Sequence, residues 1–148
     1  MNIRAFTDAD TEAVVHVWHR AGRAEYTYLP TWQIFSEAEA RSVFSSQIAS
    51  KDELWVGVEG HGITCYLAMF GSYIDRLYVH PAHQRCGCGT ALVDHAKSLC
   101  PSGLELHTHQ QNLGARALYG KLGFTAIRFG TSPAPESAPD VEYHWRPD

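Results

Sequence analysis

The chain has 148 residues, a length that suits one compact domain with one hydrophobic core. Hydrophobic residues make up 45% and charged residues 19%, which is typical of a globular protein and excludes a disordered chain. The formal net charge of −4 argues against general nucleic-acid binding, because no basic stripe is available to neutralise a phosphate backbone.

The start of the chain, Met1-Asn2-Ile3-Arg4, lacks the apolar run of a signal peptide, and no stretch is long enough to span a bilayer. We therefore expect a cytoplasmic location and no membrane partner. Four cysteines are then expected to be reduced thiols, namely Cys65, Cys86, Cys88 and Cys100.

Two helix-start signals mark the first third of the chain. Thr7 with Asp10, and Ser36 with Glu39, each combine a hydroxyl cap with an acidic residue three positions on. Apolar residues recur at helical spacing after the first signal, and Gly22 is expected to end that helix. The predicted elements are a strand over 2–6, a helix from 7 to 22, an aromatic loop or short helix over 23–35, and a helix from 36 to about 49.

Three β-rich runs follow at 54–58, 63–70 and 73–79. Residues 59–62, Glu-Gly-His-Gly, are suited to a hairpin between the first two runs. Pro81 is expected to end the third run, because proline cannot donate to a strand ladder.

The second half of the chain alternates between helix and strand patterns. Gly123 occupies the position of a helix C-terminal cap. The predicted elements are a helix over 87–99, a strand over 104–108, a helix over 113–122, a strand over 124–129, a loop over 130–139 and a strand over 141–145. The order β-α-α-β-β-β-α-β-α-β-β indicates an α/β class with a mixed sheet, and without repeats or linkers residues 1–148 are expected to form a single domain.

The segment from Gln84 to Thr90 joins a strand to a helix and contains glycines at alternating positions. Gly87 and Gly89 leave backbone N–H groups unobstructed at the positive end of a helix dipole, which makes an anion cradle suited to a pyrophosphate. Arg85 can add a charge-assisted contact. By itself a Gly-x-Gly pair is more often an ordinary strand–helix turn.

A second segment leads from a strand through Asn112 into a helix that carries Tyr119. A tyrosine at such a position is more often a core residue than a catalyst. Its phenol, with an ordinary pKa near 10, is nevertheless able to donate a proton to a leaving thiolate.

Together these two segments resemble the GNAT superfamily of N-acetyltransferases. The Q/R-x-x-G-x-G/A signature of that family is matched by Gln84, Gly87 and Gly89, and its second segment by Asn112, Ala115, Tyr119, Gly123 and Phe124. The resemblance covers nearly the whole chain. It implies a GNAT-like fold, with about four helices flanking a central mixed sheet, and transfer of an acetyl group from acetyl-CoA to an amine, expected to belong to a small molecule.

The resemblance also implies roles for particular residues. Acetyl-CoA would lie in a V-shaped opening between the fourth and fifth strands, where Tyr119 protonates the departing thiolate and the amine attacks the thioester directly. No metal is implied, and a homodimer is left open. The coenzyme-binding residues carried over are Leu77, Tyr78 and Val79 for the pantetheine arm, Gln84, Arg85, Cys86, Gly87, Cys88, Gly89 and Thr90 around the pyrophosphate, and Asn112.

Several positions depart from the family pattern. Arg85 stands where the family usually has its first glycine, and Cys86 and Cys88 replace a basic and an aliphatic residue. His107 and His109 occupy positions often taken by large apolar residues, which indicates a more polar acceptor site.

Three other interpretations fit some of these residues. His80, His83, Cys86 and Cys88 have ligand types and spacing that zinc accepts, although a metal there would occupy the anion cradle. Cys88 at a helix start is a candidate nucleophile, but its neighbours are expected to bind phosphate, far from the thioester. The third interpretation is a non-catalytic module that binds acyl-CoA or docks a partner. The presence of the glycine pattern, Asn112 and Tyr119 argues against it.

The general base and the acceptor site stay open at this level. A substrate ammonium must lose a proton before it attacks, either to water or to one of five side chains: Glu25, Asp75, His80, His107 and His109. The family places the 23–35 connection over the acceptor cleft. That connection would form an aromatic wall with one acid, made of Glu25, Tyr26, Tyr28, Trp32 and Phe35, unless these aromatics pack in the core.

Overall fold

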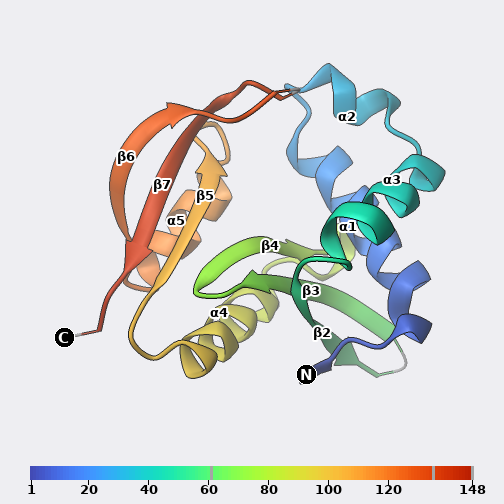
Figure 1. The fold of residues 1–148 in the computed structure, drawn as a ribbon, viewed down its shortest axis with the longest axis horizontal. Helices are drawn as coiled ribbons and strands as arrows, with labels where there is room; N and C mark the ends of the chain where they lie inside the picture. Colours follow the sequence, from blue (N-terminus) through green and yellow to red (C-terminus); the bar gives the residue numbers. More distant parts are fainter. Residues whose placement is uncertain (61, 135, 148) are drawn as a thin grey trace.

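The computed structural model describes residues 1–60, 62–134 and 136–147. Within this part of the chain, seven strands form one mixed sheet in the order β1-β2-β3-β4-β5-β7-β6 (Figure 1). Neighbouring strands are antiparallel except β4 and β5, which are parallel. The strands are β1 (Asn2–Ala5), β2 (Glu53–Glu59), β3 (Gly62–Phe70), β4 (Tyr73–Val79), β5 (Leu104–His109), β6 (Thr125–Thr131) and β7 (Pro139–Trp145).

The helices cover the two faces of the sheet, with α1 to α3 on one face and α4 and α5 on the other (Figure 1). They are α1 (Thr11–Glu25), α2 (Pro30–Ile34), α3 (Glu37–Val43), α4 (Cys88–Leu99) and α5 (Leu113–Lys121), with a π-helical turn η2 (Phe44–Ile48) and 3₁₀ turns η1 (Asp8–Asp10) and η3 (Pro81–His83). The predicted class and element order are confirmed, and α2 is the short helix expected within 23–35. No helix in the described ranges is both long enough and apolar enough to cross a membrane.

Side-chain alternation along the strands divides the interior into two cores. On β3, Tyr66 and Ala68 pack with α1 to α3, whereas Cys65 and Leu67 pack with α4 and α5. The same alternation places Tyr78 in the first core and puts Leu77 and Val79 against the second. Successive residues of β4 therefore serve opposite faces of the sheet.

The prediction that Gly22 ends the first helix was wrong. Helix α1 continues to Glu25, and Gly22 lies inside it with the indole of Trp32 packed over its Cα. A Cβ built on Gly22 would lie 2.3 Å from that ring. The glycine therefore allows α2 to approach α1 closely, which sequence alone does not distinguish from a helix stop.

Most other local signals are confirmed. Ser36 accepts a hydrogen bond from the Glu39 amide at 3.0 Å, and the Glu39 carboxylate accepts one from the Ser36 amide at 3.0 Å. Gly123 follows α5 with a φ of +92°, the left-handed conformation expected of a C-terminal glycine.

The predicted loop over 130–139 is too long. The β6–β7 pairing extends to Thr131 opposite Pro139, and Ser132 then continues it by donating its amide to the Ala138 carbonyl at 2.7 Å. In the hairpin predicted over 59–62, His61 lies outside the described residues.

Candidate active site

Strands β4 and β5 separate soon after they begin. They pair only at Tyr73–Glu105 and Ile74–Leu106, while β3 follows β4 as far as Val79. The β3–β4 register shifts at this point: Ala68 pairs with Arg76 and Met69 with Ile74, which leaves Asp75 as an extra residue on β4. Such a bulge bends a strand, so the predicted opening between the fourth and fifth strands is confirmed.

The edge of β4 that faces this opening has peptide groups that pair with no neighbouring strand in the described part of the chain. His80 donates its amide to Thr64 on β3 at 2.8 Å, so by alternation the peptide groups of Leu77 and Val79 point the other way. The Val79 carbonyl accepts a hydrogen bond from the Gln84 side chain at 3.3 Å. This edge is therefore available to an extended ligand that hydrogen-bonds like a strand.

A cavity of about 610 Å³ fills the opening. Both faces of each strand contribute to its lining: Leu77 and Tyr78 from β4, and Leu106 and His107 from β5. The cavity is thus a slot through the sheet, with one end between α4 and α5 and the other end beside the last turn of α1.

The first turn of α4 borders the end of the slot that lies between α4 and α5. Gly87 precedes the helix with a φ of +82°, and no side chain among the described residues caps its free N–H groups. Arg85 has a φ of +65°, a conformation that residues other than glycine rarely adopt. The loop therefore keeps the backbone path of a glycine-rich turn, with an arginine at the position of one glycine.

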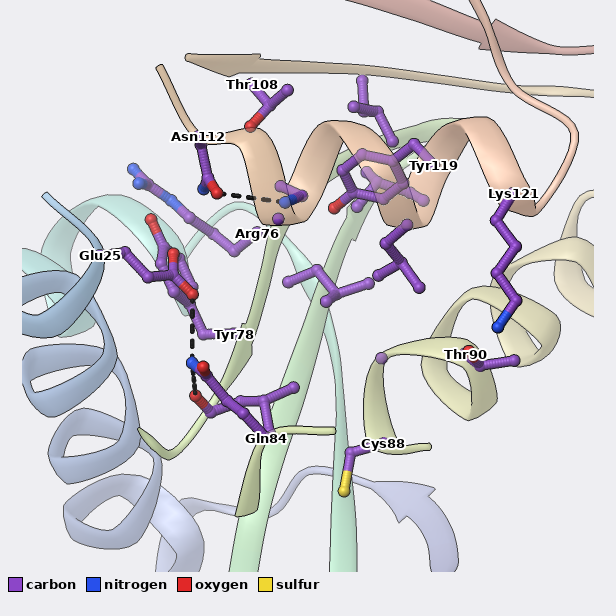
Figure 2. Close-up of a pocket in the computed structure, with 18 of the residues that line it drawn as sticks. Glu25, Arg76, Tyr78, Gln84, Cys88, Thr90, Thr108, Asn112, Tyr119 and Lys121 are labelled. Atoms are coloured by element: carbon purple, nitrogen blue, oxygen red, sulfur yellow. Dashed lines mark hydrogen bonds between the residues drawn. The ribbon is translucent and has the colours of Figure 1, made fainter. Parts of the chain in front are cut away.

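The cysteines of this loop behave differently from each other. Cys88 lines the slot through its backbone, but its thiol is buried and points away from the slot, 3.7 Å from the His83 carbonyl (Figure 2). Cys86 is exposed and does not line the slot. Cys88 therefore offers only its backbone to the anion cradle. Cys86, predicted to bind the coenzyme as well, is not among the residues that line the slot.

The other predicted binding and catalytic residues line the slot. Asn112 caps α5 by accepting a hydrogen bond from the Ala115 amide at 3.1 Å through its Oδ1, and its amide nitrogen donates to the Glu25 carboxylate. Tyr119 is buried on α5, and its side chain faces the slot (Figure 2). Burial first, and the nearby Glu25 carboxylate second, raise the pKa of Tyr119 above its ordinary value, so its phenol stays protonated. The predicted residues found in the lining are Leu77, Tyr78, Val79, Gln84, Arg85, Gly87, Cys88, Gly89, Thr90, Asn112 and Tyr119.

Among the five candidate bases, Glu25 lies at the end of α1 beside the slot and has a raised pKa. It is the last residue of α1, lines the slot and accepts a hydrogen bond from Gln84 at 3.5 Å (Figure 2). Burial raises the pKa of Glu25 to about 7, and a hydrogen bond from Asn112 partly opposes that rise. A carboxylate of this kind is able to take up and release a proton near neutral pH.

The remaining candidates are engaged elsewhere or lie outside the slot. His80 packs against His16 and His83 outside it, and burial lowers its pKa. His109 is buried and contacts Tyr28 at 2.9 Å. His107 does line the slot, where its Nδ1 contacts the Tyr73 hydroxyl at 2.8 Å.

Asp75 also lines the slot but lies 3.3 Å from Lys51. Burial acts to raise the pKa of Asp75, but its hydrogen bond with Asp52 and the charges of Arg76 and Lys51 outweigh that effect and lower the pKa. An ordinary or lowered pKa makes Asp75 a weaker base than Glu25.

The aromatic wall is smaller than predicted. Glu25 and Tyr26 line the slot, whereas Tyr28, Trp32 and Phe35 do not. Trp32 packs against Trp18 and Phe35 with ring centroids 5.7 and 5.4 Å apart. These aromatics form the core between α1 and α2, which supports Tyr26 in its place at the slot.

Sequence reasoning missed two basic residues in the lining. Arg76 on β4 lies on the α1 side, and Lys121 at the end of α5 extends toward the start of α4 near Thr90 (Figure 2). Alternation from Tyr78 predicts the side of Arg76, but only the bulge at Asp75 brings it to the slot. As for the zinc interpretation, the described residues include no group of three side chains that could hold a metal.

Comparison with known proteins places this geometry among acetyltransferases. Residues 12–124 match the model of the Acetyltransferase (GNAT) family. The chain is 30% identical over 128 residues to the peptidyl-lysine N-acetyltransferase YjaB of Escherichia coli K12, covering 84% of this chain and 82% of that protein.

Solved structures show the same architecture. Apo YjaB from Escherichia coli superposes with a TM-score of 0.81 and 25% identity over 97% of this chain and 96% of that one. The PaiA N-acetyltransferase of Thermoplasma acidophilum, solved in complex with coenzyme A, superposes with a TM-score of 0.70 and 17% identity over 99% of this chain and 98% of that one. At this identity the second likeness concerns the fold alone.

Proposed function

The chain belongs to the acetyltransferase (GNAT) family, and from that premise we propose that it acetylates the ε-amine of lysine in a protein or peptide. Acetyl transfer from acetyl-CoA to an amine is the activity of the chain itself. The lysine acceptor is suggested by the relative named a peptidyl-lysine N-acetyltransferase. The small-molecule acceptor expected from the sequence is the alternative that the peptide assay below tests.

Acetyl-CoA fits the α4–α5 side of the slot. The pantetheine arm would pair with the free edge of β4 at Leu77 and Val79, and Asn112 would donate its amide from the opposite side. The pyrophosphate would accept hydrogen bonds from the uncapped N–H groups at the start of α4, with Arg85 and Lys121 supplying positive charge. The open space around Gly87, where an added Cβ would meet nothing within 4 Å, is consistent with a close ligand.

The raised pKa of Glu25 is the single observation that supports deprotonation of an acceptor ammonium in the slot, as a lysine acceptor requires. A lysine ε-ammonium has an ordinary pKa near 10.4 and must lose a proton before its nitrogen attacks. Glu25, with a pKa of about 7, would first hold the ammonium by charge and then accept that proton.

The reaction then proceeds within one ternary complex. The neutral amine attacks the thioester carbonyl carbon, a C–N bond forms, and the C–S bond breaks to release the coenzyme thiolate. The new amide nitrogen then loses its second proton to solvent, and solvent returns a proton to the thiolate to give the free thiol. Because the pKa of Tyr119 is raised, complete proton transfer from its phenol to the thiolate is uphill. Tyr119 therefore acts chiefly as a hydrogen-bond donor to the departing sulfur.

The test uses the whole protein, acetyl-CoA and a synthetic peptide with acetylated N-terminus and one lysine, with release of free coenzyme thiol as readout. The same peptide with Nε-acetyl-lysine should give no signal above hydrolysis. Turnover of small amines but of no lysine peptide would overturn the lysine acceptor while leaving the acetyltransferase activity intact.

The role of Glu25 has its own measurement. In the wild type, kcat/KM should rise with pH through a midpoint near 7, because Glu25 accepts a proton only when ionised. Glu25→Gln should lower kcat/KM by about 100-fold and remove that midpoint, whereas Glu53→Gln, an exposed residue at the start of β2, should preserve both. An unchanged pH profile in Glu25→Gln would mean that water, and not Glu25, accepts the proton of the substrate ammonium.

A further inference from the structure

Arg76 reaches the acceptor side of the slot from the middle of β4. It lies on the same face of the strand as Tyr78, and its guanidinium is beside the Tyr78 phenol (Figure 2). The indole of Trp18 covers it from α1, with 5.5 Å between the guanidinium carbon and the ring centroid. The side chain is 33% exposed, so it is held in place on two sides and open toward the slot.

Among the described residues, Arg76 has one long ion pair, with Asp75. The nearest carboxylate oxygen belongs to Asp75, at 3.9 Å from Nε, which is beyond hydrogen-bonding distance. Nε itself is buried without a hydrogen-bond partner there. The guanidinium also bonds to the Tyr78 phenol, so the cation is fixed in position while no carboxylate of the described residues lies within hydrogen-bonding distance of it.

The acids around Arg76 are each bound more closely by another group. Asp75 lies 3.3 Å from the Lys51 amine and shares a hydrogen bond with Asp52. Glu136 lies 3.4 Å from His109 and accepts a hydrogen bond from the Trp32 indole at 3.3 Å. Neither carboxylate is free to turn toward the guanidinium without breaking an existing contact.

Glu25 and Arg76 therefore present opposite charges to the same end of the slot. Both line it from the α1 side, and no ion pair joins them among the described contacts. Glu25 matches the ammonium of an acceptor, which leaves the guanidinium complementary to an anionic group on the same molecule. A guanidinium binds a carboxylate in a planar, two-point geometry that no neutral side chain reproduces.

We propose that Arg76 selects lysine acceptors that carry an aspartate or glutamate next to the lysine in the sequence. This rests on the proposed lysine acceptor and adds to it a preference for an acidic neighbour. Arg76 contacts the acceptor away from the reacting atoms, so it is a specificity residue. Arg76 should therefore lower the KM of the enzyme for acidic acceptors and leave kcat nearly unchanged.

The experiment compares three peptides with acetylated N-terminus and amidated C-terminus, in which the residues flanking a single lysine are aspartate, asparagine or arginine. The aspartate peptide should have a KM at least tenfold below that of the asparagine peptide, and the arginine peptide the highest KM. Raising the salt to about 0.5 M should shrink these differences in the wild-type enzyme, because the attraction is electrostatic.

Substitutions of Arg76 test whether this residue causes the preference for an acidic neighbour. Arg76→Gln should bring the aspartate and asparagine peptides to equal KM, and Arg76→Lys should keep a reduced preference because it retains charge without the two-point geometry. Arg128 is an exposed arginine on the edge strand β6 and pairs with Glu142 on β7, so Arg128→Gln should keep the full preference. Melting curves check that each variant is folded, and the salt series stands independently of them.

Equal KM for the three peptides in the wild type, or a full preference in folded Arg76→Gln, would overturn the role of Arg76 and leave the lysine acceptor standing. No turnover of any lysine peptide would overturn the lysine acceptor, and this inference with it. The two failures are therefore distinguishable.

Discussion

At the level of single residues, Arg85 has a backbone conformation that does not suit its side chain. A left-handed φ costs a residue with a Cβ roughly 1–2 kcal/mol, and such strain is commonly kept at functional positions. Arg85→Gly would remove the strain but make the unfolded chain more flexible, and these effects nearly cancel.

We therefore expect Arg85→Gly to melt within a few degrees of the wild type and to bind coenzyme A about tenfold more weakly, as measured by calorimetry. Arg85→Lys keeps both the strain and the charge and should bind nearly as well as the wild type. Equal affinity in all three proteins would show that residue 85 makes no contact with phosphate.

The phenol of Tyr119 gives the second prediction at this level. Tyr119→Phe keeps the ring and its packing against Phe124, with centroids 5.5 Å apart, so the fold and coenzyme affinity should be preserved. Loss of the hydrogen bond to the sulfur should lower kcat by about tenfold or more in the thiol-release assay. Tyr143→Phe, a packed tyrosine outside the slot lining, is the matched control. If Tyr119→Phe turns over at the wild-type rate across alkaline pH, the departing thiolate is stabilised and protonated by water and not by Tyr119.

At the level of elements, Gly22 controls how α2 sits against α1. Gly22→Ala would force the Trp32 ring away from a Cβ at 2.3 Å, and overpacking of this kind costs about 1–3 kcal/mol. We expect a lower melting temperature and a raised acceptor KM, because Tyr26 at the slot is supported by Trp32, 5.6 Å between centroids.

Gly120→Ala provides the contrast for that prediction. Gly120 lies in α5, and nothing lies within 4 Å of an added Cβ there. Alanine should therefore stabilise the helix by up to about 1 kcal/mol. If both alanine variants melt alike, Gly22 does not mediate the packing of α2.

Elements are also the level at which the sequence was most informative. Capping signals and hydrophobic periodicity predicted every strand and the four longer helices to within a few residues, because those signals are local. The role of Gly22 could not be predicted, since its partner Trp32 lies ten residues away and meets it only in the folded chain.

The site shows the same limit. His107 and His109 share one face of β5, yet only His107 lines the slot, because the strands separate at a particular register. The sequence offered five candidate bases, and only the folded chain shows that burial at the end of α1 raises the pKa of Glu25. Arg76 gave no signal, because its exposure to the slot depends on the bulge at Asp75.

At the level of the whole molecule, two halves of the sheet meet through only two residue pairs of β4 and β5. A coenzyme that hydrogen-bonds to β4 and to α5 would bridge the halves. At 100 times its Kd, a ligand of the native state stabilises by about 2.7 kcal/mol. For a chain of this size, that corresponds to a rise of about 5–10 °C in melting temperature.

Amide hydrogen exchange tests whether coenzyme A binds along the edge of β4. The amides of Leu77 and Val79, which face the opening, should become protected when coenzyme A binds, whereas those of Tyr78 and His80, already paired with β3, should change less. Absence of any melting shift at millimolar acetyl-CoA would contradict binding in the slot.

A slot with an opening on each face of the sheet has a consequence for the order of events in turnover. Each substrate has its own entrance, so neither blocks the route of the other, and a spent coenzyme can be exchanged while the acceptor stays docked. Coenzyme A as product should then compete with acetyl-CoA but not with the acceptor. A protein with several neighbouring lysines could accordingly receive more than one acetyl group during a single encounter.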